Sequence, residues 1–124
     1  MPTASCAVPD RYETDAEGKR LVRADPANLY SLIACGTLFR TEQLRAVGGY
    51  HSLYWEEYDL YLRLKPLGPF TRVPRPLYTY RRHQAAMTSN PETRRRGWRE
   101  LAETWGAQAL RAAGRHVDLE EALR

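Results

Sequence analysis

Residues 55–64, which read WEEYDLYLRL, constrain the fold more strongly than any other segment of the chain. A helix beginning here would carry three acids in its first turn, Glu56, Glu57 and Asp59, followed mostly by apolar or aromatic residues. Asp59 and Arg63 would pair at i, i+4 on a solvated stripe, while the apolar remainder indicates a helix buried inside a larger body. The acids either complement the helix dipole or mark a functional site, and the pattern alone leaves both interpretations open.

On such a helix, the Glu57 side chain points in a different direction from that of Glu56. One residue along a helix rotates the side-chain direction by about 100°, which carries Glu57 toward the side of Leu60, Tyr61 and Leu64. Glu56 stays on the side of Asp59 and Arg63. The two adjacent glutamates are therefore expected on different faces of the helix.

The length and composition are those of one globular domain. The chain has 124 residues, of which 43% are hydrophobic and 27% charged. No apolar run approaches the roughly 20 residues that a membrane span needs, and the N-terminus lacks the pattern of a secretory signal. Cys6 and Cys35 lie far apart without a CxxC motif, so we expect reduced thiols and a cytoplasmic location.

Basic residues concentrate in the second half of the chain. Residues 69–124 hold 11 basic and 6 acidic side chains, against 8 and 9 in residues 1–68. Residues 69–99 contain eight arginines and one acid, Glu92. Such a patch attracts phosphate in a nucleic acid, an anionic membrane face or a nucleotide diphosphate, or is simply a basic surface. No helix-turn-helix spacing, RNP aromatic pattern or zinc-ligand set accompanies it, which disfavours a nucleic-acid partner.

The first half of the chain predicts a loose arm, a hairpin and a short strand–helix unit. We expect residues 1–10 to form a flexible arm and residues 11–23 to form a hairpin around the turn-like DAEG segment. A brief buried strand is expected at residues 37–40. Thr41 would then cap a short helix at residues 42–47, which the Gly48-Gly49 pair ends.

The second half predicts an irregular strand and a long helix. Pro66 should end the acidic helix near Lys65, and two prolines at positions 74 and 76 place the extended residues 70–80 at a sheet edge. The SNPE sequence at residues 89–92 is a helix start, and this helix should run to about residue 113. One more helical turn is expected in residues 118–124. The apolar stripe of the long helix consists of Trp98, Leu101, Trp105 and Ala109.

Four motifs in order resemble the second half of family-2 glycosyltransferases. They are GTLFR at residues 36–40, LRAVGGY at residues 44–50, WEEYDLYLRL at residues 55–64 and VPRPLYTYRRH at residues 73–83. The family has a small-residue/Phe-Arg element, a short helix closed by paired glycines, an E-D-x-D-L-W-L-R helix and a P-x-P-L-Y-x-Y-R-x-H strand. The resemblance covers roughly residues 30–90, about half of the chain.

The resemblance implies an α/β fold that is part of a GT-A-type fold. A short mixed sheet with a hairpin would pack against the central acidic-start helix and a long C-terminal amphipathic helix. Residues 11–90 would form an acceptor-side subdomain, and residues 91–124 a helical segment. The implied activity is transfer of a sugar from a nucleotide-sugar donor to a hydroxyl of a sugar or lipid-linked acceptor.

The resemblance also implies roles for the three acids. The family's base is the second acid of its motif, which corresponds to Glu57, although this chain has Glu where Asp is usual. A carboxylate there takes the acceptor proton as the new bond forms. Glu56 would orient or bind the acceptor, and Asp59 would support the start of the helix.

Further site residues follow from the same resemblance. Trp55 and Tyr54 would bind the acceptor, with a role in the core as the alternative for Trp55. The residues expected to balance the charge of the leaving diphosphate are Arg40, Arg81 and Arg82. His83 matches a position that helps to hold a divalent metal or the diphosphate in some relatives, and the complete enzyme would use Mg²⁺ or Mn²⁺.

The donor-binding half of the family has no counterpart in this sequence. No D-x-D motif occurs in it, and no βαβ opening of the doubly wound kind precedes the four motifs. We therefore expect an acceptor-side half that needs a complementary nucleotide-binding half for activity. The alternative is a non-catalytic binding or assembly module that dimerises through the helix bearing Trp98 and Trp105.

Overall fold

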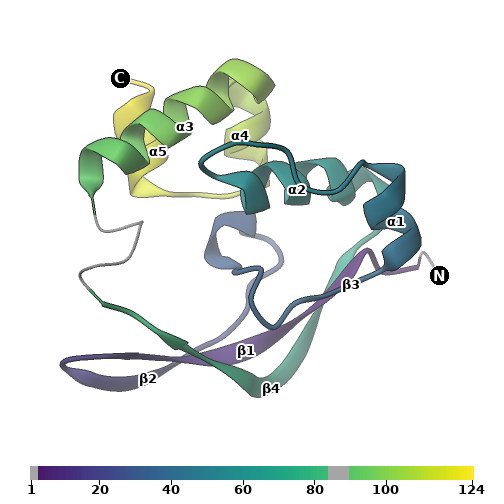
Figure 1. Ribbon diagram of the computed structural model, residues 1–124, viewed down its shortest axis with the longest axis vertical. Coiled ribbons are helices and arrows are strands. Elements are labelled where there is room, and N and C mark those ends of the chain that lie inside the picture. The colour runs from purple at the N-terminus through teal and green to yellow at the C-terminus, as the bar shows by residue number, and fades with distance from the viewer. Residues whose placement is uncertain (1–2, 84–89) are drawn as a thin grey trace.

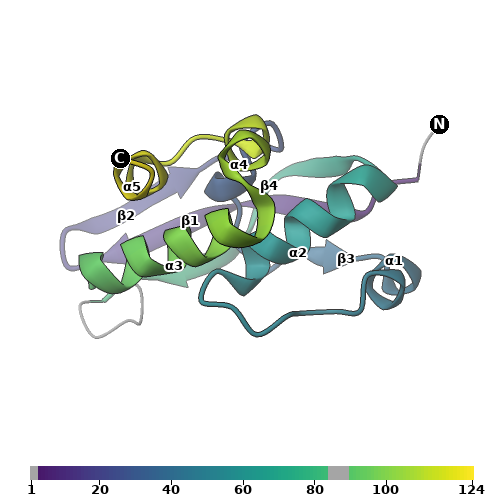
Figure 2. The same ribbon diagram turned by 90° about the horizontal axis from the view of Figure 1, so that it is seen from above.

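The computed structural model describes residues 3–83 and 90–124. It is a mixed α/β structure in which the larger helices cover one face of a four-stranded sheet (Figures 1 and 2). The strands are β1 (Cys6–Asp15), β2 (Gly18–Val22), β3 (Leu38–Phe39) and β4 (Phe70–Arg81). The helices are η1 (Leu29–Ser31), α1 (Thr41–Ala46), α2 (Glu56–Leu64), η2 (Lys65–Leu67), α3 (Pro91–Trp105), α4 (Ala107–Ala113) and α5 (Val117–Ala122).

Strand β1 is the centre of the sheet. It pairs antiparallel with β2 and β3 and parallel with β4. The hairpin expected at residues 11–23 and the short mixed sheet are therefore confirmed. The flexible arm is wrong for residues 6–10, which lie in β1 with Cys6 and Val8 buried. The sequence pattern does not predict this part of the strand, because it contains Pro9 and Asp10 and both residue types are uncommon inside sheets.

Strand β4 is an edge strand, as its prolines predict. Its pairing with β1 shifts in register on either side of Asp10, where the partners on β4 jump from Val73 to Pro76 and then to Tyr78. Prolines lack the backbone donor of a regular ladder and fit at such irregularities. Strand β3 exists as expected, but Leu38 is 73% exposed, so it is not a buried strand.

The two central helices differ in how well the sequence predicts them. Helix α2 is buried along most of its length, as expected, and Leu60, Tyr61 and Leu64 are 0% exposed. Helix α1 starts one residue earlier than expected, with Arg40 and not Thr41 in the capping position. The paired glycines after it adopt positive φ angles of 79° and 69°, which supports the predicted left-handed ending.

The long C-terminal helix is interrupted. Gly106 has a φ of 84° and separates α3 from α4, so the continuous helix predicted to residue 113 is wrong. The expected start is present, because the Asn90 side chain accepts hydrogen bonds from the first-turn amides; Ser89 lies outside the described residues. Helix α5 confirms the additional helical turn.

The apolar stripe of α3 packs on this chain. Trp98 and Leu101 are 0% and 1% exposed and belong to the same core as Tyr30, Tyr58 and Val8. Trp98 therefore has no exposed surface with which to contact a second chain, whereas Trp105 is half-buried. Dimerisation through this helix stays a prediction.

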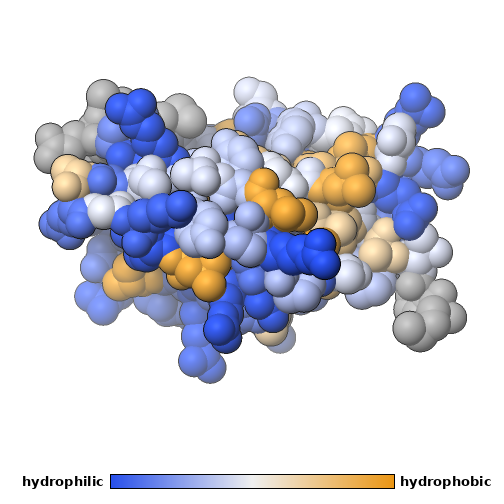
Figure 3. Space-filling view, turned by 90° about the horizontal axis from the view of Figure 1, so that it is seen from below, coloured by the Kyte–Doolittle hydropathy of each residue, from blue (hydrophilic) through white to orange (hydrophobic). Residues whose placement is uncertain are grey.

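The face of the sheet away from α2–α5 is mostly hydrophilic. Figure 3 shows this face with separate hydrophobic patches between hydrophilic residues. Among the residues that the structure describes, no helix combines the length and apolar character required for a bilayer crossing.

Candidate functional site

The three acids at the start of α2 lie in three different environments. Glu56 is exposed, Glu57 is half-buried, and Asp59 is 1% exposed. The divergence between the adjacent glutamates follows from the rotation of about 100° per helical residue. Of the three acids, only Glu57 is partly buried and still accessible to solvent. This is the usual condition for an acid that exchanges protons with a ligand.

Asp59 joins three segments of the fold. Its Oδ1 accepts a hydrogen bond of 2.8 Å from the Trp105 indole, and its Oδ2 accepts one of 3.1 Å from Arg63 Nε. The His51 Nδ1 lies 3.3 Å from the same Oδ2. The i, i+4 pair with Arg63 is confirmed, but it is buried and not on a solvated stripe. Asp59 therefore supports the helix start and is not free to act on a substrate.

The Glu57 carboxyl is perturbed by its surroundings. Burial raises its pKa above the usual value, the adjacent Glu56 charge adds to the rise, and a hydrogen bond with its own backbone N–H opposes it. A carboxyl whose pKa is raised is a stronger base once ionised, which suits proton transfer near neutral pH.

The Glu57 charge acts on four tyrosine hydroxyls. Burial raises the pKa of each of these hydroxyls, and the Glu57 charge contributes to each rise. These residues are Tyr50, Tyr54, Tyr58 and Tyr61. Tyr50 is 48% exposed, whereas Tyr61 is fully buried, so the group runs from the surface to the core.

Trp55 does not offer a ring face to a sugar. It is 6% exposed, stacks on Tyr58 with ring centroids 5.0 Å apart, and donates its indole N–H to the Arg94 carbonyl. The acceptor role for Trp55 is thus wrong, and the core alternative is correct. Tyr54 is half-buried; its ring packs edge-on against Trp55, and its backbone amide donates to Glu100.

The arginines expected to bind one diphosphate lie at opposite ends of the sheet. Arg40 follows β3, which pairs with Cys6 at the start of β1, whereas Arg81 pairs with Thr14 near its end. At about 3.3 Å per residue the two ends are roughly 25 Å apart. Arg40 donates to the Ala4 carbonyl. A joint site that includes Arg40 is therefore wrong.

Most of the arginine-rich segment is paired with acids. Five of the eight arginines in residues 69–99 form ion pairs: Arg72 with Asp10, Arg82 with Glu13, Arg94 with Asp118, Arg95 with Glu92 and Glu121, and Arg99 with Glu92. This pairing reduces the positive field that the sequence predicts at this surface.

His83 lies two residues beyond the end of β4 and is exposed. Within residues 3–83 and 90–124, no group of three or more His, Cys, Asp or Glu side chains is arranged to hold a metal. The metal role of His83 therefore stays a prediction.

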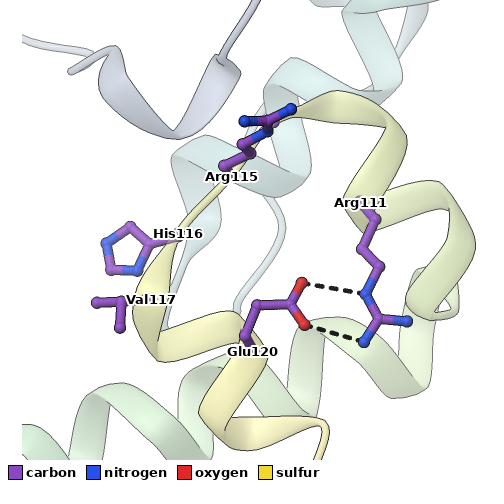
Figure 4. A pocket seen from close by; sticks show the side chains of 6 residues that line it. Arg111, Arg115, His116, Val117 and Glu120 are labelled. Carbon is purple, nitrogen blue, oxygen red and sulfur yellow. Dashed lines mark hydrogen bonds and ion pairs between the residues drawn. The ribbon is translucent and has the colours of Figure 1, made fainter.

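A shallow depression occurs elsewhere, between α4 and α5 (Figure 4). It is lined by Arg111, Gly114, Arg115, His116, Val117 and Glu120. The Arg111 guanidinium and the Glu120 carboxylate form two hydrogen bonds of 3.0 Å across it. None of the residues predicted for a site lines this depression.

Sequence reasoning missed two of the tyrosines on which the Glu57 charge acts. Tyr50 ends the LRAVGGY motif and Tyr61 lies within the acidic helix, yet neither received a role. The i, i+4 relation between Glu57 and Tyr61 is visible in the sequence. The proximity of Tyr50 to Glu57 cannot be seen in the sequence, because it depends on the path of the loop before α2.

Neither a protein-family model nor a curated protein sequence matches the chain.

Proposed function

We propose that this chain forms the acceptor side of a sugar transferase and that Glu57 is its general base. An acceptor hydroxyl would approach beside Tyr50, and the Glu57 carboxylate would take its proton. The acceptor oxygen would form a bond to the anomeric carbon of the donor while the bond from that carbon to the diphosphate breaks.

The single observation that carries this proposal is the environment of Glu57. A half-buried carboxyl with a raised pKa, one residue from an exposed acid, is typical of a group with a proton-transfer role. Tyr50 and Tyr54 add the aromatic and hydroxyl surface that sugar recognition needs. The order of the strand, short helix, acidic helix and final strand also agrees with the resemblance.

Of the donor, only the diphosphate is assigned to residues of this chain. The diphosphate would meet Arg81 and Arg82 at the end of β4, although Arg82 already pairs with Glu13. The proposal contains no step through a metal.

Acceptor binding can be measured by NMR on the isotopically labelled chain. Methyl glycosides of common hexoses and N-acetylhexosamines serve as probes, and we expect saturable shifts confined to Tyr50, Tyr54 and Glu57. Loss of one charge-assisted hydrogen bond, worth about 1.5 kcal/mol, should weaken binding roughly tenfold in Glu57→Ala.

The matched control is Glu17→Ala, which removes an exposed glutamate in the turn between β1 and β2, outside the proposed site, and should change the affinity little. A second experiment adds uridine diphosphate sugars and MnCl2 and follows release of the nucleoside diphosphate. The proposal fails if no probe sugar binds, or if the two alanine variants weaken binding equally.

A second candidate is a non-catalytic assembly module that uses the helix-free face of the sheet. Three strand leucines are exposed, Leu21 at 49%, Leu38 at 73% and Leu77 at 65%. The hydrophobic patches in Figure 3 are separate, whereas association surfaces are usually contiguous. Sedimentation over a hundredfold concentration range tests this function, and a constant monomer mass would exclude self-assembly through this face.

A further inference from the structure

The Tyr61 hydroxyl is a buried polar group with no hydrogen-bond partner among the described residues. The Tyr61 side chain is 0% exposed. Two neighbouring buried tyrosines are satisfied, because Tyr58 donates to the Tyr30 carbonyl at 3.1 Å and Tyr30 donates to the Leu110 carbonyl. A buried hydroxyl without a partner is unfavourable, so this exception calls for a physical reason.

Helix geometry places Tyr61 beside the turn that carries Glu57, and the Glu57 charge acts on the Tyr61 hydroxyl. Side chains on an α-helix lean toward its N-terminus, and residues at i and i+4 are neighbours on one face. The ring is fixed in place: its centroid lies 5.7 Å from that of Phe70 and 6.3 Å from that of Tyr58. Between these two residues, Glu57 is therefore the one that can move.

Glu57 has the freedom to reach the hydroxyl. Its side chain is half-buried and has three rotatable bonds. Its carboxyl interacts with its own backbone N–H, which is a weak local contact compared with a phenol donor. A phenol that donates to an ionised carboxylate makes one of the stronger hydrogen bonds in proteins.

We propose that the ionised Glu57 carboxylate turns inward and accepts a hydrogen bond from the Tyr61 hydroxyl, so that Tyr61 is the positioning residue of Glu57. The pair forms when Glu57 is charged and is lost when Glu57 is protonated, because a protonated carboxyl is a poorer acceptor.

Two of the other hydroxyls around Glu57 are less suited to act as this donor. Glu56 precedes it on α2, and the hydroxyls that sense its charge besides Tyr61 are those of Tyr50, Tyr54 and Tyr58. Of these, Tyr58 already donates elsewhere and Tyr50 is half-exposed. The positive charge of Arg94 lowers the pKa of Tyr54, and that of Arg11 lowers the pKa of Tyr58, each against the larger effect of burial.

The consequence for catalysis rests on the proposed function. Burial alone pushes Glu57 toward the protonated state, in which it cannot accept a proton. A hydrogen bond from Tyr61 would keep it ionised until an acceptor hydroxyl arrives and would hold one carboxylate oxygen while the other faces the acceptor.

The test is an NMR titration of the Glu57 side-chain carboxyl carbon in the wild type and in Tyr61→Phe. A hydrogen bond to the charged form lowers a carboxyl pKa, so the variant should raise the Glu57 pKa by about one unit, a tenfold change in acidity. The matched control is Tyr58→Phe, which removes a hydroxyl that is bonded elsewhere and should leave the Glu57 pKa unchanged.

A second measurement needs no change at position 61. The ring carbons of Tyr61 in the wild type should titrate with the pKa of Glu57, and this response should vanish in Glu57→Gln. Equal Glu57 pKa values in the wild type and Tyr61→Phe, together with a Tyr61 ring that does not respond to pH, would overturn the inference.

These outcomes are separate from those of the sugar-binding experiment. A shifted Glu57 pKa without sugar binding would support the pair and contradict the proposed function. Sugar binding without the shift would support the function and contradict the pair.

Discussion

Replacement of Asp59 by alanine is the most informative test of how this fold holds Glu57 in place. The carboxylate is 1% exposed and joins the Trp105 indole, the Arg63 guanidinium and the His51 ring. Asp59→Ala removes the partner of a buried cation, since the Arg63 side chain is 12% exposed. Breaking a buried ion pair from one side costs about 3–5 kcal/mol.

This loss is a large part of the stability of such a domain. Domains of this size unfold with a free energy of about 5–15 kcal/mol, and each kcal/mol shifts Tm by roughly 3–5 °C. We therefore expect Asp59→Ala to lower Tm by about 10–20 °C. Asp59→Asn keeps an oxygen acceptor for Trp105 but removes the charge. Its loss of stability should therefore lie between zero and that of Asp59→Ala.

Urea unfolding and a double-mutant cycle with Trp105→Phe measure these effects. Because the indole donates to Asp59 at 2.8 Å, we expect a coupling free energy of about 1–3 kcal/mol between the two positions. The reasoning is refuted if Asp59→Ala costs less than about 1 kcal/mol, or if the two substitutions are additive.

Two further predictions concern other buried contacts. Asp10 has its pKa lowered from 3.8 to about 2, mainly by a hydrogen bond from Arg72; its stabilisation is therefore complete above pH 4 and lost as pH falls toward 2. Asp10→Asn should be less stable than the wild type in urea at pH 7, with the difference closing near pH 2; a constant difference across this range would contradict the assignment. Alanine usually stabilises a helix relative to glycine by about 1 kcal/mol, but at Gly97 its Cβ would lie 2.4 Å from Tyr54 Cδ1. Gly97→Ala should therefore destabilise by about 1–3 kcal/mol, whereas the exposed Glu103→Ala control should be nearly neutral; a stabilised Gly97→Ala would show that this contact relaxes freely.

The sequence determined the local elements of this protein. Helix α2 follows from a dense apolar pattern that begins with acids and ends at Pro66. The hairpin of β1 and β2 follows from a turn-rich segment between two short runs. The positive φ angles of Gly48 and Gly49 follow from the one residue type that adopts them freely. Each of these results depends on interactions within a few residues, which a sequence pattern contains.

Only the tertiary structure decided which side chains share an environment. Cys6 to Asp10 became part of the central strand because β4 arrives from more than fifty residues away to cover its other edge. Trp55 became a core residue because Trp98 and Tyr58 pack around it. Asp59 connects α2 to α3 because the Trp105 indole of α3 donates a hydrogen bond to its carboxylate.

The same distinction applies to the candidate site. The rotation of about 100° per residue separates Glu57 from Glu56, and the near-complete turn from i to i+4 aligns Glu57 with Tyr61. The sequence contains both relations. The separation of Arg40 from Arg81, the burial of Tyr61 and the approach of Tyr50 arise from contacts between distant segments. Such contacts are set by how the sheet and helices pack, which local spacing does not encode.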